Sequence, residues 1–209
     1  VGRRGSLNGK LTIKGKQGHV AYPDKASNPI HSCLTALAEL SAVTWDTGNT
    51  FFPPTSFQIS NFQSGTGATN VIPGDAIIDF NFRYSTESTE PSLMQRTEDI
   101  LKHYHLEYAL QWSLSGEPFL TQDGVLITST SAAVNKIKGY QPVLSTGGGT
   151  SDGRFIAPSG IEVVEIGLCN ETIHQINECT SLSDLRDLTL IYLDIMEGIL
   201  LPDNSQHVS

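Results

Sequence analysis

Long apolar runs and targeting patterns are missing from this sequence of 209 residues. No stretch approaches the ~20 apolar residues that a membrane-spanning helix needs. The first residues also lack a basic segment followed by an apolar stretch, which is the pattern of a signal peptide. The composition, with 38% hydrophobic and 17% charged residues, is that of a globular protein. We therefore expect a soluble protein of one large or two small domains with no membrane partner.

Basic residues and cysteines are also scarce. There are 13 Lys and Arg against 22 Asp and Glu, which gives a formal net charge of -9. Nucleic acids bind clustered Lys and Arg, so we expect no nucleic-acid partner, whereas small anionic ligands stay possible. Cys33, Cys169 and Cys179 form no Cys-x-x-Cys pair. An odd number of cysteines without a disulfide pattern favours a reducing compartment, and we expect a cytoplasmic location.

A complete metal-binding motif is missing as well. Three or four ligands must converge at about 2 Å on one ion, which in a self-contained site leaves short, regular spacings. His-Glu-x-x-His does not occur. His174, in the segment Ile-His-Gln-Ile-Asn-Glu-Cys, resembles a metal ligand whose partner ligands are absent from the sequence. A lone histidine is more often an ordinary core or surface residue. The chain would then carry only part of a site.

Residues 7 to 114 show the element order β-α-β-β-α-β. Apolar residues alternate with polar ones where we expect strands, and recur at helical spacing where we expect helices. The expected strands contain residues 11–13, 57–59, 78–84 and 106–112. Asn28 and Pro29 open the first expected helix as N-cap and first-turn proline, and a second helix starts near Glu90. The predicted buried stripe of the first helix consists of Ile30, Leu34, Leu37 and Leu40 or Ser41.

This order predicts an α+β domain with an antiparallel sheet that carries two helices on one face. Its end is expected at Gly116-Glu117-Pro118. Beyond it we predict a helix over 125–138 with Gly139 as its left-handed C-cap, a buried strand over 161–166, and an amphipathic helix that begins with the capping-box pattern at Ser181. One strand cannot form a sheet that covers two helices. The second region therefore resembles the tail of an α/β domain.

Several segments, taken together and in order, resemble a known family. They are Gly2-Arg3-Arg4-Gly5-Ser6, Gly18-His19-Val20-Ala21-Tyr22-Pro23, Asn70-Val71-Ile72-Pro73, Arg83-Tyr84, the segment from Thr146 to Arg154, and the segment from Ile173 to Glu178. The chain is similar to the dinuclear zinc metallohydrolases of the aminoacylase and carboxypeptidase G2 type. Within that group, Gly-Gly-Gly-Thr-Ser-Asp-Gly-Arg points to the succinyl-diaminopimelate desuccinylases. The resemblance covers essentially the whole chain, but only the C-terminal part of the family's length.

The resemblance implies a division of labour along the chain. Residues 5–117 would be a lid and dimerisation domain, 118–209 the C-terminal portion of the α/β catalytic domain, and 1–4 part of the crossover strand. The family's N-terminal half supplies the first zinc-binding His, the bridging Asp, two further carboxylate ligands and the general-base Glu. None of these occurs here, so we expect this chain alone to be inactive. Its expected partners are a small-molecule substrate, a second copy bound through the lid, and the missing N-terminal half.

The resemblance also assigns catalytic and metal-binding roles. His174 would be a ligand in a site with two zinc ions, or cobalt, in the complete enzyme. His19 and Asn70 would reach across the dimer and donate hydrogen bonds to the scissile carbonyl oxygen. Without the family, a simple turn histidine explains His19 equally well.

A second group of residues would bind the substrate, whose carboxylates pair well with guanidinium groups. The substrate-binding residues implied by the resemblance are Arg3, Ser6, Tyr22, Arg83, Ser115, Gly149, Thr150 and Asn170. Solvent exposure alone explains Arg83 equally well. The run Gly147 to Gly149 lacks the spacing of a phosphate-binding loop, so we interpret it as a nest of backbone N–H groups for a carboxylate.

The implied reaction is hydrolysis of N-succinyl-LL-2,6-diaminopimelate to succinate and LL-diaminopimelate, a step that serves lysine and cell-wall precursor biosynthesis. Amide hydrolysis of this kind needs a metal-activated water, a carboxylate base and donors for the oxyanion. Two alternatives stay open. The chain could belong to a related deacylase or aminopeptidase of the same superfamily, or act as a dimerisation module without catalysis.

Overall fold

The computed structural model of the chain describes residues 1–169 and 171–201. The chain forms two compact units. Unit 1 contains Val1–Arg3, Phe119–Gly147 and Ser151–Ser209, and unit 2 contains Arg4–Pro118 and Gly148–Thr150.

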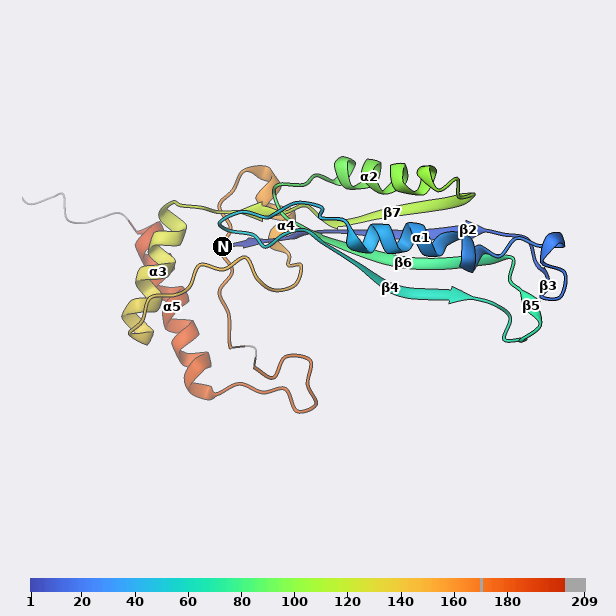
Figure 1. Ribbon diagram of the computed structural model, residues 1–209. Coiled ribbons are helices and arrows are strands. Elements are labelled where there is room, and N and C mark those ends of the chain that lie inside the picture. The colour runs from blue at the N-terminus through green and yellow to red at the C-terminus, as the bar shows by residue number, and fades with distance from the viewer. Residues whose placement is uncertain (170, 202–209) are drawn as a thin grey trace, which may run out of the picture. The chain divides into compact units, whose positions relative to one another are not determined.

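Unit 2 is built on a four-stranded antiparallel sheet with the strand order β4-β6-β2-β7 (Figure 1). These strands are β2 (Gly5–Lys14), β4 (Ser56–Ser64), β6 (Asp75–Tyr84) and β7 (Tyr108–Gly116). Two helices, α1 (Pro29–Ala42) and α2 (Glu90–His103), share one hydrophobic core with the sheet. The predicted order β-α-β-β-α-β and the α+β class are therefore confirmed for this part of the chain.

The period-two pattern of β6 explains the core of unit 2. Ile78, Phe80, Phe82 and Tyr84 alternate along the strand and are all buried. The Trp45 ring packs edge-on against Phe82, with 4.6 Å between the ring centroids. Residues between the buried ones point to the opposite face of the sheet because successive strand residues alternate in direction. That opposite face is consequently polar.

The helices of unit 2 start at capped residues. Asn28 Oδ1 accepts a hydrogen bond from the Ile30 N–H at 3.0 Å, as predicted. Thr89 and Ser92 form a reciprocal capping box at the start of α2. This capping box was not predicted from the sequence.

The predicted buried stripe of α1 is wrong in part. Leu37 and Leu40 are buried, but Leu34 is 54% exposed, and the small side chains of Cys33 and Ala36 are buried in its place. Both sets have helical spacing, so periodicity alone did not separate them. Small residues let the helix approach the sheet closely, which turns the leucine at position 34 outward.

Asp46 forms hydrogen bonds with several loops at one end of this core. Its carboxylate accepts hydrogen bonds from the Gly48 and Thr55 N–H groups, both at 2.9 Å. It also accepts from the hydroxyls of Ser85 at 3.1 Å and Ser88 at 2.6 Å. One side chain therefore links the segment after α1 to the turn that follows β6.

Unit 1 is built around two helices, α3 (Val125–Lys138) and α5 (Leu182–Leu200). They pack through Ala133, Val134, Ile191 and Ile195. Gly139 ends α3 in the left-handed region with φ 77, as predicted. The remaining elements of unit 1 are the paired strands β1 (Gly2–Arg3) and β8 (Phe119–Leu120), the short helix α4 (Gly153–Ile156) and the 3-10 turn η2 (Ala157–Ser159).

The predicted strand over 161–166 is wrong. The segment is not a strand in the structure, and Ile161 is 59% exposed. The segment contacts Thr121, the residue that follows β8: the Val163 N–H donates to Thr121 Oγ1 at 3.0 Å, and that hydroxyl donates to the Val163 carbonyl at 2.8 Å. The apolar residues of this segment, Ile161, Val163, Val164 and Ile166, could be buried in a sheet only where neighbouring strands exist to pair with it.

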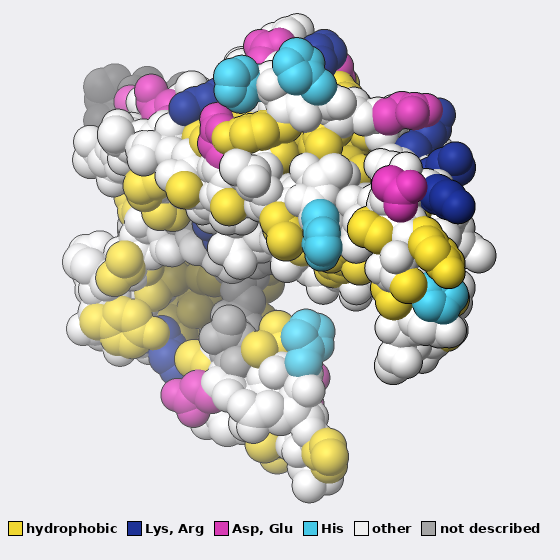
Figure 2. All heavy atoms as spheres, turned by 45° about the vertical axis from the view of Figure 1, so that its right-hand side comes forward, with side chains coloured by type: hydrophobic (Ala, Val, Ile, Leu, Met, Phe, Trp, Pro, Cys, Tyr) yellow, Lys and Arg dark blue, Asp and Glu magenta, His cyan; other side chains and the backbone are white. Residues whose placement is uncertain are grey.

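Unit 1 leaves many apolar side chains exposed, Val143, Ile176 and Leu182 among them. In the view of Figure 2, hydrophobic side chains reach the surface in several separate places. None of the helices within residues 1–169 and 171–201 is long and apolar enough to cross a membrane.

Candidate active-site residues

Two segments far apart in the sequence meet at a small two-stranded sheet in unit 2. β3 (Gly18–His19) pairs with β5 (Val71–Ile72), so that His19 lies opposite Val71. The Val20 N–H also donates to the Asn70 carbonyl at 3.1 Å. The structure therefore brings together His19 and Asn70, the two residues expected to act on a carbonyl oxygen. We call this part, residues 18–25 and 70–72, the tip.

A backbone contact favours one tautomer of the neutral His19 ring. The Ala21 N–H donates to Nδ1 at 3.1 Å, so the neutral imidazole carries its proton on Nε2. The side chain is exposed and its ring lies 5.8 Å from that of Tyr22, centroid to centroid. Nε2–H is thus a fixed hydrogen-bond donor on an accessible ring, which is what an oxyanion donor requires.

A polar network covers the face of the sheet that the helices leave open. Asn81 Nδ2 donates to Ser6 Oγ at 3.1 Å and to Asn8 Oδ1 at 2.8 Å. Asn8 Nδ2 in turn donates to Ser115 Oγ at 2.9 Å. Ser6 and Ser115, both predicted to bind substrate, are therefore joined by two asparagines that the sequence analysis missed. The signal was present, since Asn8 and Asn81 alternate onto the same face as Ser6 and Arg83.

Arg83 and Thr150 also meet within unit 2. Arg83 Nη1 donates to Thr150 Oγ1 at 2.8 Å, and Arg83 lies opposite Ser6 in the pairing of β6 with β2. The guanidinium is part-buried and hydrogen-bonded, so solvent exposure alone does not explain this residue. Two residues expected to bind the same substrate are in direct contact.

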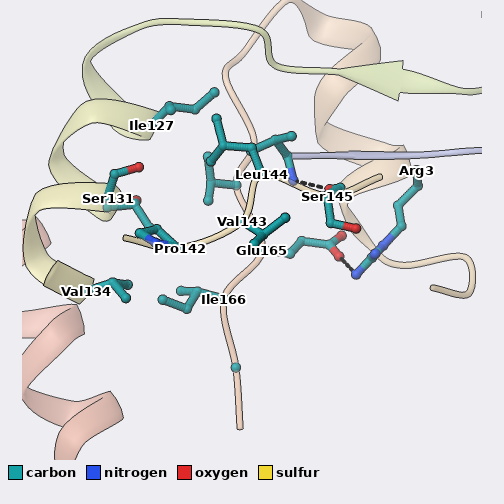
Figure 3. Close-up of a pocket in the computed structure, with 14 residues that line it drawn as sticks. Arg3, Ile127, Ser131, Val134, Pro142, Val143, Leu144, Ser145, Glu165 and Ile166 are labelled. Carbon is teal, nitrogen blue, oxygen red and sulfur yellow. Dashed lines mark hydrogen bonds and ion pairs between the residues drawn. The ribbon is translucent and has the colours of Figure 1, made fainter. Parts of the chain in front are cut away.

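Arg3 lies in unit 1 beside a cavity of about 260 Å³. Figure 3 shows its guanidinium and the carboxylate of Glu165 pointing toward one another, and they form an ion pair. Arg3 Nη1 also donates to the Gly147 carbonyl, and Glu165 accepts a hydrogen bond from Ser151. Sequence reasoning missed Glu165, because nothing local distinguishes it from any other charged residue in an extended segment.

His174 is exposed in a turn and adopts a positive φ of 60. Its N–H donates to Glu178 Oε2 at 3.3 Å. Within residues 1–169 and 171–201 no group of three or more His, Cys, Asp or Glu could hold a metal ion. One imidazole does not supply the three or four ligands that zinc needs, so the described residues do not form a metal site by themselves. Asn170, also predicted to bind substrate, lies outside the described residues.

Comparison with known proteins decides the family. Residues 1–109 match the family model described as the peptidase dimerisation domain of the M20 type. The chain belongs to this family. Its succinyl-diaminopimelate desuccinylase relatives include that of Alkalilimnicola ehrlichii, 58% identical over 200 residues, which are 96% of this chain and 53% of that protein. The desuccinylase of Nitrosococcus oceani is 60% identical over 199 residues, 95% of this chain and 53% of that protein.

The chain thus spans about half the length of the curated relatives that it matches. Among solved structures, the aminopeptidase PepT from Bacillus cereus has a TM-score of 0.72 at 22% identity, covering 95% of this chain and 52% of that one. An M20 family metallo-carboxypeptidase from Sulfolobus solfataricus has a TM-score of 0.71 at 13% identity, covering 95% and 58%. At these identities the likeness shows the fold alone.

Proposed function

We propose that this chain is part of an enzyme that hydrolyses N-succinyl-LL-2,6-diaminopimelate to succinate and LL-diaminopimelate in the cytoplasm. The observation that carries the proposal is 58–60% identity to proteins named succinyl-diaminopimelate desuccinylase over 95–96% of the chain. Identity at this level makes a shared substrate the simplest explanation of the shared residues. Within the enzyme, the chain would supply dimer contacts, substrate contacts and a donor for the carbonyl oxygen.

The geometry around His19 supports a specific role, that of a hydrogen-bond donor to the carbonyl oxygen. When the amide is attacked, negative charge develops on the carbonyl oxygen, and a positioned N–H stabilises that charge more than it stabilises the ground state. The bond from the Ala21 N–H to Nδ1 supports this role because it keeps Nε2–H as the donor. Asn70, held at the same tip, is a second amide donor. We propose that both act on the active site of a partner copy.

The substrate carries several carboxylates, and the polar face of unit 2 offers matching groups. Arg83 supplies positive charge, and its bond to Thr150 brings a hydroxyl beside the guanidinium. Ser6 and Ser115 add hydroxyls held by Asn81 and Asn8. These groups would orient the substrate, and correct orientation of the reacting groups lowers the activation barrier.

A divalent metal belongs to the proposed reaction, with two zinc ions, or cobalt, per active site. When bound, the metal would supply an activated water at neutral pH. His174 would contribute one ligand from this chain, and its exposed position in a turn supports that role. The remaining ligands and the general base would come from the N-terminal half of the enzyme.

Reconstitution tests the proposal. We expect the chain alone, with zinc or cobalt added, to show no hydrolysis of the succinylated substrate. Joined to the N-terminal half of the Alkalilimnicola ehrlichii desuccinylase, it should hydrolyse that substrate and discriminate against the acetylated one. Preference for the acetylated substrate would instead place the chain with the related deacylases. Turnover by the chain alone, near that of the complete enzyme, would contradict the assignment of the missing half.

A dimerisation role without catalysis is the second candidate, favoured by the description of the matching family. Light scattering of the purified chain should give a dimer at micromolar concentration, through the self-complementary contact typical of homodimers. Dimerisation together with no activity in any reconstituted enzyme would favour this second role. A monomer at that concentration would contradict dimerisation through unit 2.

A further inference from the structure

The glycine-rich loop of residues 147–150 needs external support if it is to bind a ligand in one conformation. Gly148 has a φ of 98, and a β-carbon added at Gly149 would meet nothing within 4 Å. Three consecutive glycines have the largest conformational freedom of any such segment, so ordering them on binding costs affinity. A nest of N–H groups is therefore effective only if the flanks of the loop are already fixed.

Both flanks are fixed by one carboxylate in unit 1. Glu165 Oε2 forms an ion pair with Arg3, whose Nη1 donates to the Gly147 carbonyl at the first flank. Glu165 Oε1 accepts from the Ser151 hydroxyl at the second flank. Figure 3 shows how the Arg3 and Glu165 side chains converge beside Ser145, whose hydroxyl accepts from the Gly147 N–H at 3.0 Å. The two oxygens of Glu165 thus serve the two ends of the loop.

The chemistry of this bridge requires a carboxylate. The Arg3 and Glu165 side chains are only 23% and 26% exposed, so the guanidinium has an uncompensated charge if Glu165 is neutralised. Arg3 Nε is already buried without a hydrogen-bond partner among the described residues. A glutamine can still form hydrogen bonds with Arg3 and Ser151, but it carries no negative charge to compensate the guanidinium.

We propose that Glu165 is a positioning residue that presets the loop carrying Gly149 and Thr150 for the substrate. The proposal rests on the proposed function, which assigns these two residues to substrate binding. Because Glu165 acts before the substrate arrives, its loss raises KM and leaves kcat nearly unchanged. We expect KM to rise by about tenfold, the scale of ordering a few residues on binding.

Hydrogen exchange on the chain of 209 residues tests the structural half of this inference without any enzyme activity. Glu165→Gln should accelerate amide exchange across residues 147–151. The matched control is Glu162→Gln, on the same extended segment. Its carboxylate accepts from the Leu126 N–H at 3.1 Å, which an amide oxygen can do equally well. Equal exchange of the loop in wild type and Glu165→Gln would overturn the proposal.

Kinetics of the reconstituted enzyme test the functional half. Glu165→Gln should raise KM about tenfold with kcat and metal content preserved, Glu165→Asp should recover part of the loss because it keeps both oxygens, and Glu162→Gln should match wild type. A fall in kcat at constant KM would overturn the positioning role. If the reconstituted wild type has no desuccinylase activity, the proposed function fails, and the exchange measurement still decides whether Glu165 orders the loop.

Discussion

The ring of Phe80 lies directly on the backbone of Gly9. The two residues are opposite one another in β6 and β2, and a β-carbon at Gly9 would come within 2.1 Å of Phe80 Cζ. Glycine in a strand interior ordinarily weakens a sheet, because it adds backbone entropy to the unfolded chain and packs no side chain. Here the missing side chain makes room for an aromatic ring at the centre of the core.

Gly9→Ala should therefore destabilise unit 2. The new methyl group and the buried ring cannot occupy the same space, and overpacking of this kind costs about 1–3 kcal/mol. Urea unfolding followed by tryptophan fluorescence measures the change, since Trp45 packs in the same core. Gly149→Ala is the control, because a β-carbon there has no neighbour within 4 Å. Equal stability of Gly9→Ala and wild type would mean that the Phe80 ring can adopt another rotamer without loss of packing, and would contradict the prediction.

Asp46 should make the stability of unit 2 depend on pH in acid. Burial raises the pKa of this carboxyl, but hydrogen bonds from Ser88 and Thr55 outweigh burial and hold the pKa at about 2, below its ordinary 3.8. The carboxylate therefore stabilises the fold above pH 3.8, and this contribution disappears as the pH falls through about 2.

Asp46→Asn removes that dependence at a cost. An amide has one acceptor oxygen, so some of the donors around position 46 lose their partner, which should lower the free energy of unfolding at neutral pH by about 1–3 kcal/mol. Unfolding curves at a series of pH values should show a shallower acid decline in the variant. The exposed Asp75→Asn serves as control. An acid decline as steep in Asp46→Asn as in wild type would assign it to other groups.

Much of unit 2 was predictable because its signals are local. Alternation in β6 and the N-cap at Asn28 act within a few residues, so the sequence alone contains them. The buried face of α1 was not fully predictable. Cys33 and Leu34 fit helical periodicity equally well, and only the shape of the sheet decides which of them is buried. The strand prediction for 161–166 was wrong because its Ile and Val residues indicate burial in a sheet, and the described residues form no strand beside them.

The candidate site divides in the same way. Motif spacing and resemblance indicated His19, Asn70, Arg83 and Thr150, and the structure brings them into two pairs. The partners that hold other site residues, such as Glu165 beside Arg3, come from distant parts of the chain. Such contacts depend on tertiary packing, which a single sequence does not reveal. The assigned roles of these residues are still predictions.

His19 and His174 should fail in different ways when replaced. In the reconstituted enzyme, His19→Ala should lower kcat by roughly 10²–10³-fold with metal content unchanged, the usual effect of losing one oxyanion donor. His174→Ala should lower the bound metal measured by atomic absorption. Loss of metal in His19→Ala would contradict its role as a donor that does not bind metal. A full complement of metal in His174→Ala would contradict its role as a metal ligand.

Mixing experiments show whether His19 acts on a partner copy. Combining a His19→Ala enzyme with a His174→Ala enzyme should produce some heterodimers in which one site has both an intact metal centre and an intact donor. Activity should then recover in part. If mass spectrometry shows subunit exchange and no activity returns, His19 acts within its own subunit or has no catalytic part.

Unit 1 should be less stable than unit 2 in the chain of 209 residues. Its described core cluster is small, with Ala133, Val134, Ile191 and Ile195, and large apolar side chains such as Val143 stay exposed. Stability follows buried apolar area, so amides of α3 and α5 should exchange faster than those of β2 and β6. Slower exchange in unit 1 would show that its ion pairs, including Lys138 with Asp187, contribute more than exposed pairs do.

The strands at the tip of unit 2 are held by few backbone pairs. The ladder of β3 and β5 consists of two residue pairs, whereas β2 and β6 pair along their whole length. Local opening of such a short ladder costs little of the global free energy of unfolding, and segments of this kind tolerate insertions and substitutions. Mutations that alter what the tip contacts can therefore accumulate without loss of the fold, while the Gly9–Phe80 contact permits almost none. The residues around His19 can therefore vary long before the sheet must change.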